Sequence, residues 1–163
     1  MDKILVSACL LGSPVRYNGS DRLVKDSLIT LWREQGRIVP LCPEVAAGLP
    51  TPRPPAEIEP GLSSDDVLAG KARIFDDTGE DVTRPFRQGA EIALEMAQSQ
   101  GCRFALLTDG SPSCGSSFIY SGHFDGVART GSGVVAALLS ANGITVFSDN
   151  QVAELAKALD QPT

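Results

Sequence analysis

The chain has 163 residues, of which 42% are hydrophobic and 21% are charged. This length and usage are typical of one globular unit with a hydrophobic core, so we expect residues 1–163 to form a single domain. The formal net charge is −6 and the sequence pI is about 4.7. An acidic chain lacks the clustered Lys and Arg that bind a phosphate backbone, which argues against nucleic acid as a partner. No apolar run approaches the ~18–20 residues that cross a bilayer, so no membrane partner is expected.

The N-terminal sequence MDKILVSACLLG is expected to form a first strand over residues 3–8. It lacks the small-residue cleavage site of an export signal, so we expect a cytoplasmic protein. In that compartment four Cys are expected to be metal ligands or reactive thiols, because disulfides are rare there.

Strand and helix patterns alternate along the rest of the chain. The expected strands are residues 3–8, 37–41, 71–75, 102–107 and 144–147, and the expected helices are residues 21–34, 84–100, 134–141 and a last helix that ends at Leu159. Pro40 indicates that the second strand is short or lies at an edge. This alternation predicts an α/β fold, a three-layer Rossmann-like sandwich around a mainly parallel sheet.

Turn and capping residues set the expected helix ends. Ser20 is the expected N-cap of the first helix, Gly36 follows that helix, and Thr83 is the expected cap of the second. Ser148 and Gln151 are spaced as a capping box before the last helix. Residues 43–60 contain six prolines, which predicts an extended loop without helix.

Three of the four cysteines follow expected strands. Cys9, Cys42 and Cys114 come after the strands that begin near residues 3, 37 and 102, whereas Cys102 opens a strand. The carboxyl ends of parallel strands share one edge of a sheet, which is where open α/β sheets bind ligands. We therefore expect three thiols to converge, with Cys102 at the opposite edge, roughly 17 Å away at ~3.3 Å per residue.

These three thiols leave several interpretations open. They could be small buried hydrophobic residues, or ligands of a zinc ion whose fourth ligand is His123, although His123 fits a loop position better. They could also hold an iron–sulfur cubane with one iron left open. A nucleophilic thiol is the least favoured, because no motif pairs the single His with a Cys.

The residues around two of these cysteines add further candidates. Glu44, two positions after Cys42, is either a catalytic carboxylate or a solvated loop acid. Residues 111–115, with the sequence SPSCG, are either a nest of hydroxyl and N–H groups that holds an anion or an ordinary tight turn.

Four ordered motifs resemble one known family. They are SACLLG-x-x-VRY-x-G at 7–19, LCPEV-x-x-GL-x-x-PR-x-P-x-EI at 41–58, DVT-x-x-F-x-x-GA at 81–90 and SPSCG at 111–115. Together they resemble the short form of the thiouracil desulfidase (TudS) family, formerly a bacterial domain family of unknown function. The resemblance runs from about residue 3 to about residue 147.

This resemblance implies an iron–sulfur enzyme. Cys9, Cys42 and Cys114 would hold a [4Fe-4S] cluster whose open iron binds the substrate sulfur. Sulfur would leave thiouracil, or a thiolated uracil nucleotide, without net redox chemistry to give uracil and sulfide. The alternative is a zinc- or thiol-containing protein that binds a small molecule without catalysis.

The resemblance also implies roles for residues beside the cluster. Glu44 and either Ser111 or Ser113 would be catalytic. Arg16, Tyr17 and Arg53 lie in the motif loops, where each would bind the uracil ring, neutralise the site, or form a structural salt bridge or loop brace. Residues 108–110, TDG, stand where a basic pair often precedes SPSCG, a departure that concerns substrate preference.

Overall fold

The central element of the fold is a four-stranded sheet. The computed structural model describes residues 1–160, in which the strand order is β2-β1-β5-β8 and every neighbouring pair is parallel. The strands are β1 (Lys3–Ser7), β2 (Ile38–Leu41), β5 (Cys102–Leu107) and β8 (Thr145–Ser148). β2 lies at the edge, where the missing N–H of Pro40 costs little.

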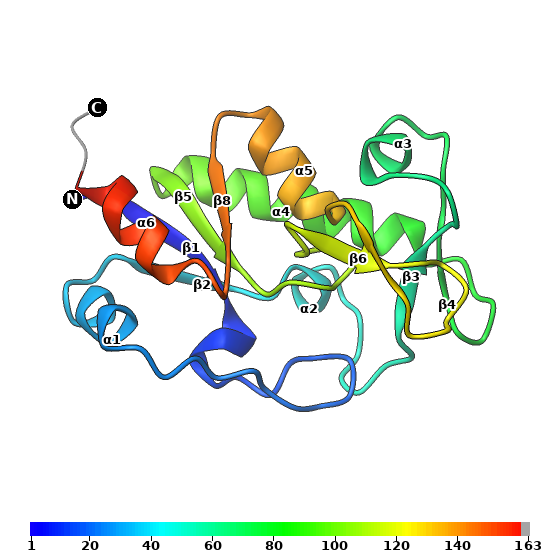
Figure 1. The fold of residues 1–163 in the computed structure, drawn as a ribbon, viewed down its shortest axis with the longest axis horizontal. Coiled ribbons are helices and arrows are strands. Elements are labelled where there is room, and N and C mark those ends of the chain that lie inside the picture. The colour runs from blue at the N-terminus through cyan, green and yellow to red at the C-terminus, as the bar shows by residue number, and fades with distance from the viewer. Residues whose placement is uncertain (161–163) are drawn as a thin grey trace.

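Helices cover both faces of this sheet (Figure 1). Alternate residues of β1 point to opposite faces: Leu5 packs in the core that includes α4 (Thr83–Ser99) and α5 (Val134–Ala141). Ile4 and Val6 pack in the core that includes α1 (Ser27–Glu34) and α6 (Val152–Leu159). The predicted three-layer α/β sandwich with a parallel sheet is therefore confirmed.

Smaller elements extend from the carboxyl edge of the sheet. They are η1 (Ala8–Leu11), α2 (Pro43–Ala46), α3 (Ser64–Leu68), and two antiparallel pairs, β3 (Ala56–Ile58) with β4 (Ile74–Asp76) and β6 (Phe118–Tyr120) with β7 (Ala128–Thr130). In Figure 1 both antiparallel pairs lie at the end of the molecule away from α1 and α6. Within residues 1–160, no helix combines the length and the apolar character that crossing a membrane requires.

The first helix starts later than expected. Its N-cap is Asp26, whose carboxylate accepts a 2.8 Å hydrogen bond from the backbone N–H of Leu28. Ser20 is therefore not the cap, and residues 21–26 are not helical. A carboxylate at this position satisfies an N–H group that has no partner within the helix, which fixes the start at Ser27.

The proline-rich segment is not a continuous loop. Residues 43–46 form α2, and the prediction that residues 43–60 exclude a helix was wrong. Pro43 stands in the first turn of α2, where no intrahelical bond needs its missing N–H. Strand β3 also lies within this segment.

Two capping predictions need correction. Thr83 is the first residue of α4, and the N-cap of this helix is Val82. The Thr83 hydroxyl does not cap the helix but donates to Asp81 Oδ1 at 2.6 Å. In the expected capping box, Gln151 Oε1 accepts from the backbone N–H of Ser148 at 2.9 Å, but Gln151 itself is the N-cap of α6.

Candidate functional site

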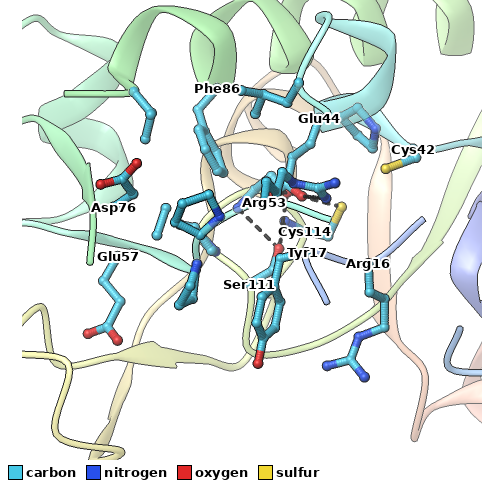
Figure 2. Close-up of a pocket in the computed structure, with 18 of the residues that line it drawn as sticks. Arg16, Tyr17, Cys42, Glu44, Arg53, Glu57, Asp76, Phe86, Ser111 and Cys114 are labelled. Carbon is cyan, nitrogen blue, oxygen red and sulfur yellow. Dashed lines mark hydrogen bonds and ion pairs between the residues drawn. The ribbon is translucent and has the colours of Figure 1, made fainter. Parts of the chain in front are cut away.

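The carboxyl ends of β1, β2 and β5 open into a cavity of about 770 Å³ (Figure 2). Nine of the side chains singled out in the sequence line it: Cys9, Arg16, Tyr17, Cys42, Glu44, Arg53, Ser111, Ser113 and Cys114. Because parallel strands bring their carboxyl ends to one edge, loops distant in sequence meet there. The sheet topology thus explains why the motifs converge.

The cysteines are placed as the strand pattern indicated. Cys9 lies in η1 directly after β1, Cys42 is the N-cap residue of α2 after β2, and Cys114 lies in the loop after β5. Cys102 pairs in register with Lys3 at the amino end of the sheet, on the opposite edge. All four thiols are free. Three therefore face one cavity, and the fourth does not.

Burial holds all three cavity thiols in their protonated form. It raises the pKa of Cys9 to about 11, with a further increase from the nearby Cys42 sulfur. It raises the pKa of Cys114 to about 12, with smaller upward contributions from Glu44 and Cys9. The pKa of Cys42 is also raised, chiefly by burial. A metal centre must displace these protons, because the thiolate is the ligand.

The donor set fits an iron–sulfur cluster. Soft thiolates suit iron–sulfur centres, and a cubane takes one thiolate at each of several irons around its surface. In the part of the chain that the structure describes, no three His, Cys, Asp or Glu side chains gather tightly enough to hold a single metal ion. His123, which the sequence favoured as a loop residue over a fourth zinc ligand, lies in the exposed connection between β6 and β7 and does not line the cavity.

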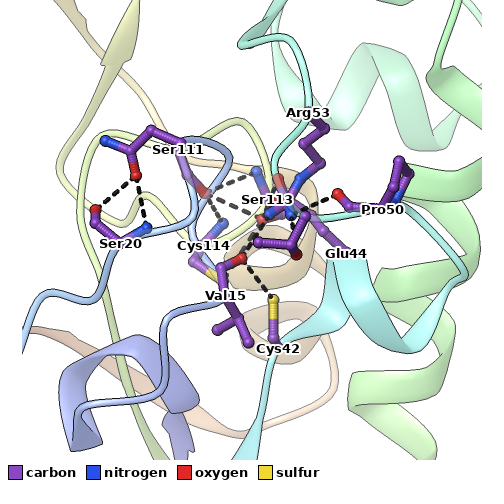
Figure 3. Close-up of polar contacts among 11 residues, drawn as sticks. Val15, Ser20, Cys42, Glu44, Pro50, Arg53, Ser111, Ser113 and Cys114 are labelled. Carbon is purple, nitrogen blue, oxygen red and sulfur yellow. Dashed lines mark hydrogen bonds and ion pairs between the residues drawn. The ribbon is translucent and has the colours of Figure 1, made fainter.

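Glu44 is held by a buried ion pair with Arg53 (Figure 3). Glu44 stands in the first turn of α2, and its Oε2 atom accepts from Nη2 of Arg53. The side chain of Arg53 is only 6% exposed and that of Glu44 is 14% exposed. At such burial, removing either partner would leave an uncompensated charge inside the protein.

The two serines of the SPSCG loop make different contacts. Ser113 Oγ donates to Glu44 Oε1 at 3.3 Å, and Ser111 Oγ lies 3.0 Å from Ser113 Oγ. Ser111 Oγ also accepts from the backbone N–H groups of Ser113 at 3.1 Å and Cys114 at 2.7 Å. With two bonds accepted, its own proton is available to Ser113, whose proton goes to Glu44.

Asp109 organises the loop that carries Cys114. Its buried Oδ1 accepts from four backbone N–H groups, those of Gly110, Ser116, Ser117 and Phe118, and its Oδ2 accepts from the Ser117 hydroxyl. Burial raises the pKa of Asp109, but the hydrogen bonds from Ser117 and the backbone outweigh it and leave that pKa lowered. The carboxylate thus connects the backbone at residue 110 to the backbone at residues 116–118 and holds the loop between them.

Arg22 was missed by the sequence analysis because residues 21–34 were expected to be helical. It lines the cavity, and its Nη1 donates to Thr108 Oγ1 at 3.2 Å and to the Asp109 carbonyl at 3.1 Å. Arg16 and Arg22 both lower the pKa of Cys9 against the effect of burial, so positive charge surrounds that thiol. The sequence signal that could have identified Arg22 as a cavity residue is its position shortly after the motif at 7–19.

The cavity has a second, acidic end that the sequence did not reveal. Figure 2 shows Glu57 and Asp76 on one side and Cys42 on the other. The lining there also includes Asp77, Glu80, Asp81, Phe86, Tyr120 and Phe124. These residues come from β3, β4, the connection between β4 and α4, α4 itself and the β6–β7 hairpin, whose assembly depends on contacts distant in sequence.

Comparison with known proteins agrees with this arrangement. The chain is 44% identical over 152 residues to the uncharacterized protein YbbK of Bacillus subtilis (strain 168), and the aligned region covers 93% of this chain and 99% of that protein. The solved structure of the [4Fe-4S]-dependent thiouracil desulfidase TudS matches with a TM-score of 0.88 and 48% identity, over 98% of each chain. The sequence model of the 2-thiouracil desulfurase family matches residues 4–151. The resemblance carried by the four motifs is therefore confirmed: the chain belongs to the 2-thiouracil desulfurase family.

Proposed function

We propose that this chain is a [4Fe-4S]-dependent desulfidase that converts a thiolated uracil into uracil and sulfide. The observation that carries this proposal is the convergence of three thiols, a carboxylate and two hydroxyl groups on one cavity. The comparison that supports this proposal is the 48% identity to a thiouracil desulfidase over nearly the whole chain. The reaction balances without an oxidant or reductant, because water supplies the oxygen that replaces sulfur and the sulfur leaves as sulfide.

Cys9, Cys42 and Cys114 would hold the cluster, one from each of three strand ends. When bound, the cluster supplies an iron without a protein ligand, which is a Lewis acid for a soft sulfur atom. The protein buries Cys9 and Cys114 and half-buries Cys42, which limits the contact of the thiolates with solvent. Arg16 and Arg22 would offset part of their negative charge.

Glu44 is the proposed general base. Its Oε1 would take a proton from the water that attacks the carbon bearing sulfur, and would return it to the departing group or to a ring nitrogen. Ser113, which donates to that same oxygen, would orient the carboxylate and the water. Ser111 is proposed to hold the loop, because it accepts from two backbone N–H groups.

Arg16 and Tyr17 are proposed to bind the pyrimidine. Both line the cavity, with the Arg16 guanidinium 6.0 Å from the centre of the Tyr17 ring. The acidic charge of the chain favours a small thiolated pyrimidine over an RNA.

We also expect the protein to work in the cytoplasm, since its free thiols need a reducing compartment.

Anaerobic purification tests the proposal. We expect a brown protein with about four irons per chain that releases sulfide and uracil from 2-thiouracil. Cys9→Ser, Cys42→Ser and Cys114→Ser should each lose most iron, while Cys102→Ser serves as the matched control with a buried thiol outside the cavity. A colourless zinc protein that binds thiouracil unchanged would support the binding-protein alternative. Equal iron loss in Cys102→Ser would show that the cluster is misplaced.

A further inference from the structure

We infer that Arg53 is a positioning residue that fixes the Glu44 carboxylate and does not itself contact the substrate. This inference rests on the proposed function, because it concerns how the proposed general base is oriented. Of the roles that the sequence left open for Arg53, it selects the structural salt bridge over substrate binding.

The donors of Arg53 are already engaged within the protein. Its Nη2 donates to Glu44 Oε2 and to the Val15 carbonyl at 3.1 Å. Its Nη1 donates to the Pro50 carbonyl and to Thr51 Oγ1, both at 3.2 Å. Each terminal nitrogen carries two N–H groups, so all four have acceptors. The planar fork therefore has no terminal donor left for a substrate carbonyl.

Arg16 shows the opposite arrangement. Its guanidinium lines the same cavity and lies near the Tyr17 ring, but within residues 1–160 it makes no ion pair. The cavity therefore contains one arginine that is occupied and buried and another whose charge is available. The available one is the better ligand for a substrate group.

The contacts of Arg53 join the three segments that surround the carboxylate. Its backbone N–H donates to the Tyr17 carbonyl at 2.6 Å, and its side chain reaches Val15, Glu44 and Pro50. The Val15 carbonyl also lies 3.9 Å from Cys42 Sγ as a hydrogen-bond acceptor. Figure 3 shows Arg53 together with Val15, Pro50, Glu44 and Ser113.

This arrangement fixes which oxygen of Glu44 is available. Arg53 holds Oε2, so Oε1 is the oxygen that meets Ser113. A base must be held in the productive geometry, and a displacement of about 1 Å can cost about 10²-fold in rate. Loss of Arg53 should therefore lower kcat through Glu44 and leave substrate affinity nearly unchanged.

Steady-state kinetics of the cluster-loaded enzyme with 2-thiouracil test this inference. We expect Arg53→Gln to lower kcat by about 10–10²-fold with KM changed by less than about twofold. Arg53→Lys keeps the charge but loses the planar fork, so its kcat should fall less. A raised KM with unchanged kcat, or wild-type kcat in Arg53→Gln, would overturn the assignment. Arg103→Gln, which breaks an ion pair with Asp2 away from the cavity, is the matched control.

A double-mutant cycle with Glu44→Gln adds a second test. If Arg53 acts only through Glu44, Arg53→Gln should cost less than about threefold in an enzyme that already carries Glu44→Gln. Multiplicative losses would show that Arg53 acts on the reaction independently, which would contradict the inference.

Two readouts do not depend on turnover. Uracil lacks sulfur, so its calorimetric affinity reports contacts to the ring, and we expect Arg53→Gln and Arg53→Lys to bind it as the wild type does. In a crystal structure of either variant, Glu44 should be rotated away from Ser113. Lost uracil binding, or an unmoved Glu44, would overturn the inference. An inactive wild type with no cluster would instead contradict the proposed function.

Discussion

Ser113 Oγ donates a 3.3 Å hydrogen bond to Glu44 Oε1, and this contact joins two loops that lie 69 positions apart in the sequence. Glu44 follows β2 and Ser113 follows β5, so the two strands between which β1 lies each supply one partner. The adjacent Cys114 places a thiol next to this pair, with Ser113 Oγ 3.6 Å from Cys114 Sγ. The carboxylate, the hydroxyl and the thiol thus form one cluster of polar contacts.

Alanine substitutions should separate the two serines. Ser113→Ala removes the donor to Glu44, so we expect kcat to fall by about 10–10²-fold with iron content unchanged. Ser111→Ala leaves the backbone N–H groups of Ser113 and Cys114 without their acceptor, at a cost of about 1–3 kcal/mol for a buried group. That variant should therefore melt at a lower temperature and retain less iron.

The comparison needs both measurements on both proteins. Iron content and thermal unfolding report the loop, whereas kcat reports the carboxylate. If Ser111→Ala slows turnover at full iron content and Ser113→Ala does not, the catalytic role belongs to Ser111.

Glu44→Gln should separate cluster assembly from turnover. The amide keeps the size of the side chain and loses its basicity, so the rate should fall by about 10²–10⁴-fold, equivalent to roughly 2.7–5.5 kcal/mol of barrier. The absorption spectrum should still show the cluster and should still change when 2-thiouracil is added. An unchanged rate would make Glu44 an ordinary loop acid, and a missing cluster would make it structural.

The parallel sheet and its three adjoining cysteines could be predicted because their signals are local. Residues 4–6 of β1 and residues 104–107 of β5 are buried and continuously apolar, as is typical of strands covered on both faces. Each cysteine then takes its place from the strand that it follows. Expected strand ends differ from the observed ones by one residue at most in β1, β2, β5 and β8.

Other features depend on contacts that a single sequence does not display. The start of α1 was misplaced because Leu23 fits the helical spacing of the apolar residues Leu28 and Leu31, although the cap is Asp26. The short helix α2 was missed because prolines dominate its surroundings. The occupied state of Arg53 follows from four acceptors on three segments, and no pattern within residues 50–53 indicates it.

Asp109→Asn should weaken the loop that carries Cys114. An amide keeps one acceptor oxygen but replaces the other with a donor that faces the Ser117 hydroxyl, and it loses the charge that strengthens the remaining bonds. We expect a loss of about 1.5–3 kcal/mol in the free energy of unfolding, measured by urea denaturation. Asp125→Asn is the control, because Asp125 also accepts from a backbone N–H and a hydroxyl, but in an exposed loop. Equal losses in the two variants would show that burial of Asp109 adds nothing.

The cavity thiols should make the metal-free protein sensitive to alkaline pH. Burial raises the pKa of Cys9 from 9.0 to about 11, so its contribution to stability is complete below pH 9 and is lost as the pH rises through about 11. A difference of about two pKa units corresponds to roughly 2.7 kcal/mol at 1.36 kcal/mol per unit. Urea denaturation of the metal-free wild type and of Cys9→Ala at pH 8 and pH 11 isolates this thiol from the Lys and Tyr side chains that titrate in the same range. The wild type should lose more stability than Cys9→Ala between the two pH values, and equal losses would mean that the Cys9 thiol ionises as easily in the folded protein as in the unfolded chain.

Iron binding should show the opposite dependence on pH, because the ligands are thiolates. Cluster reconstitution should therefore be faster at pH 9 than at pH 7.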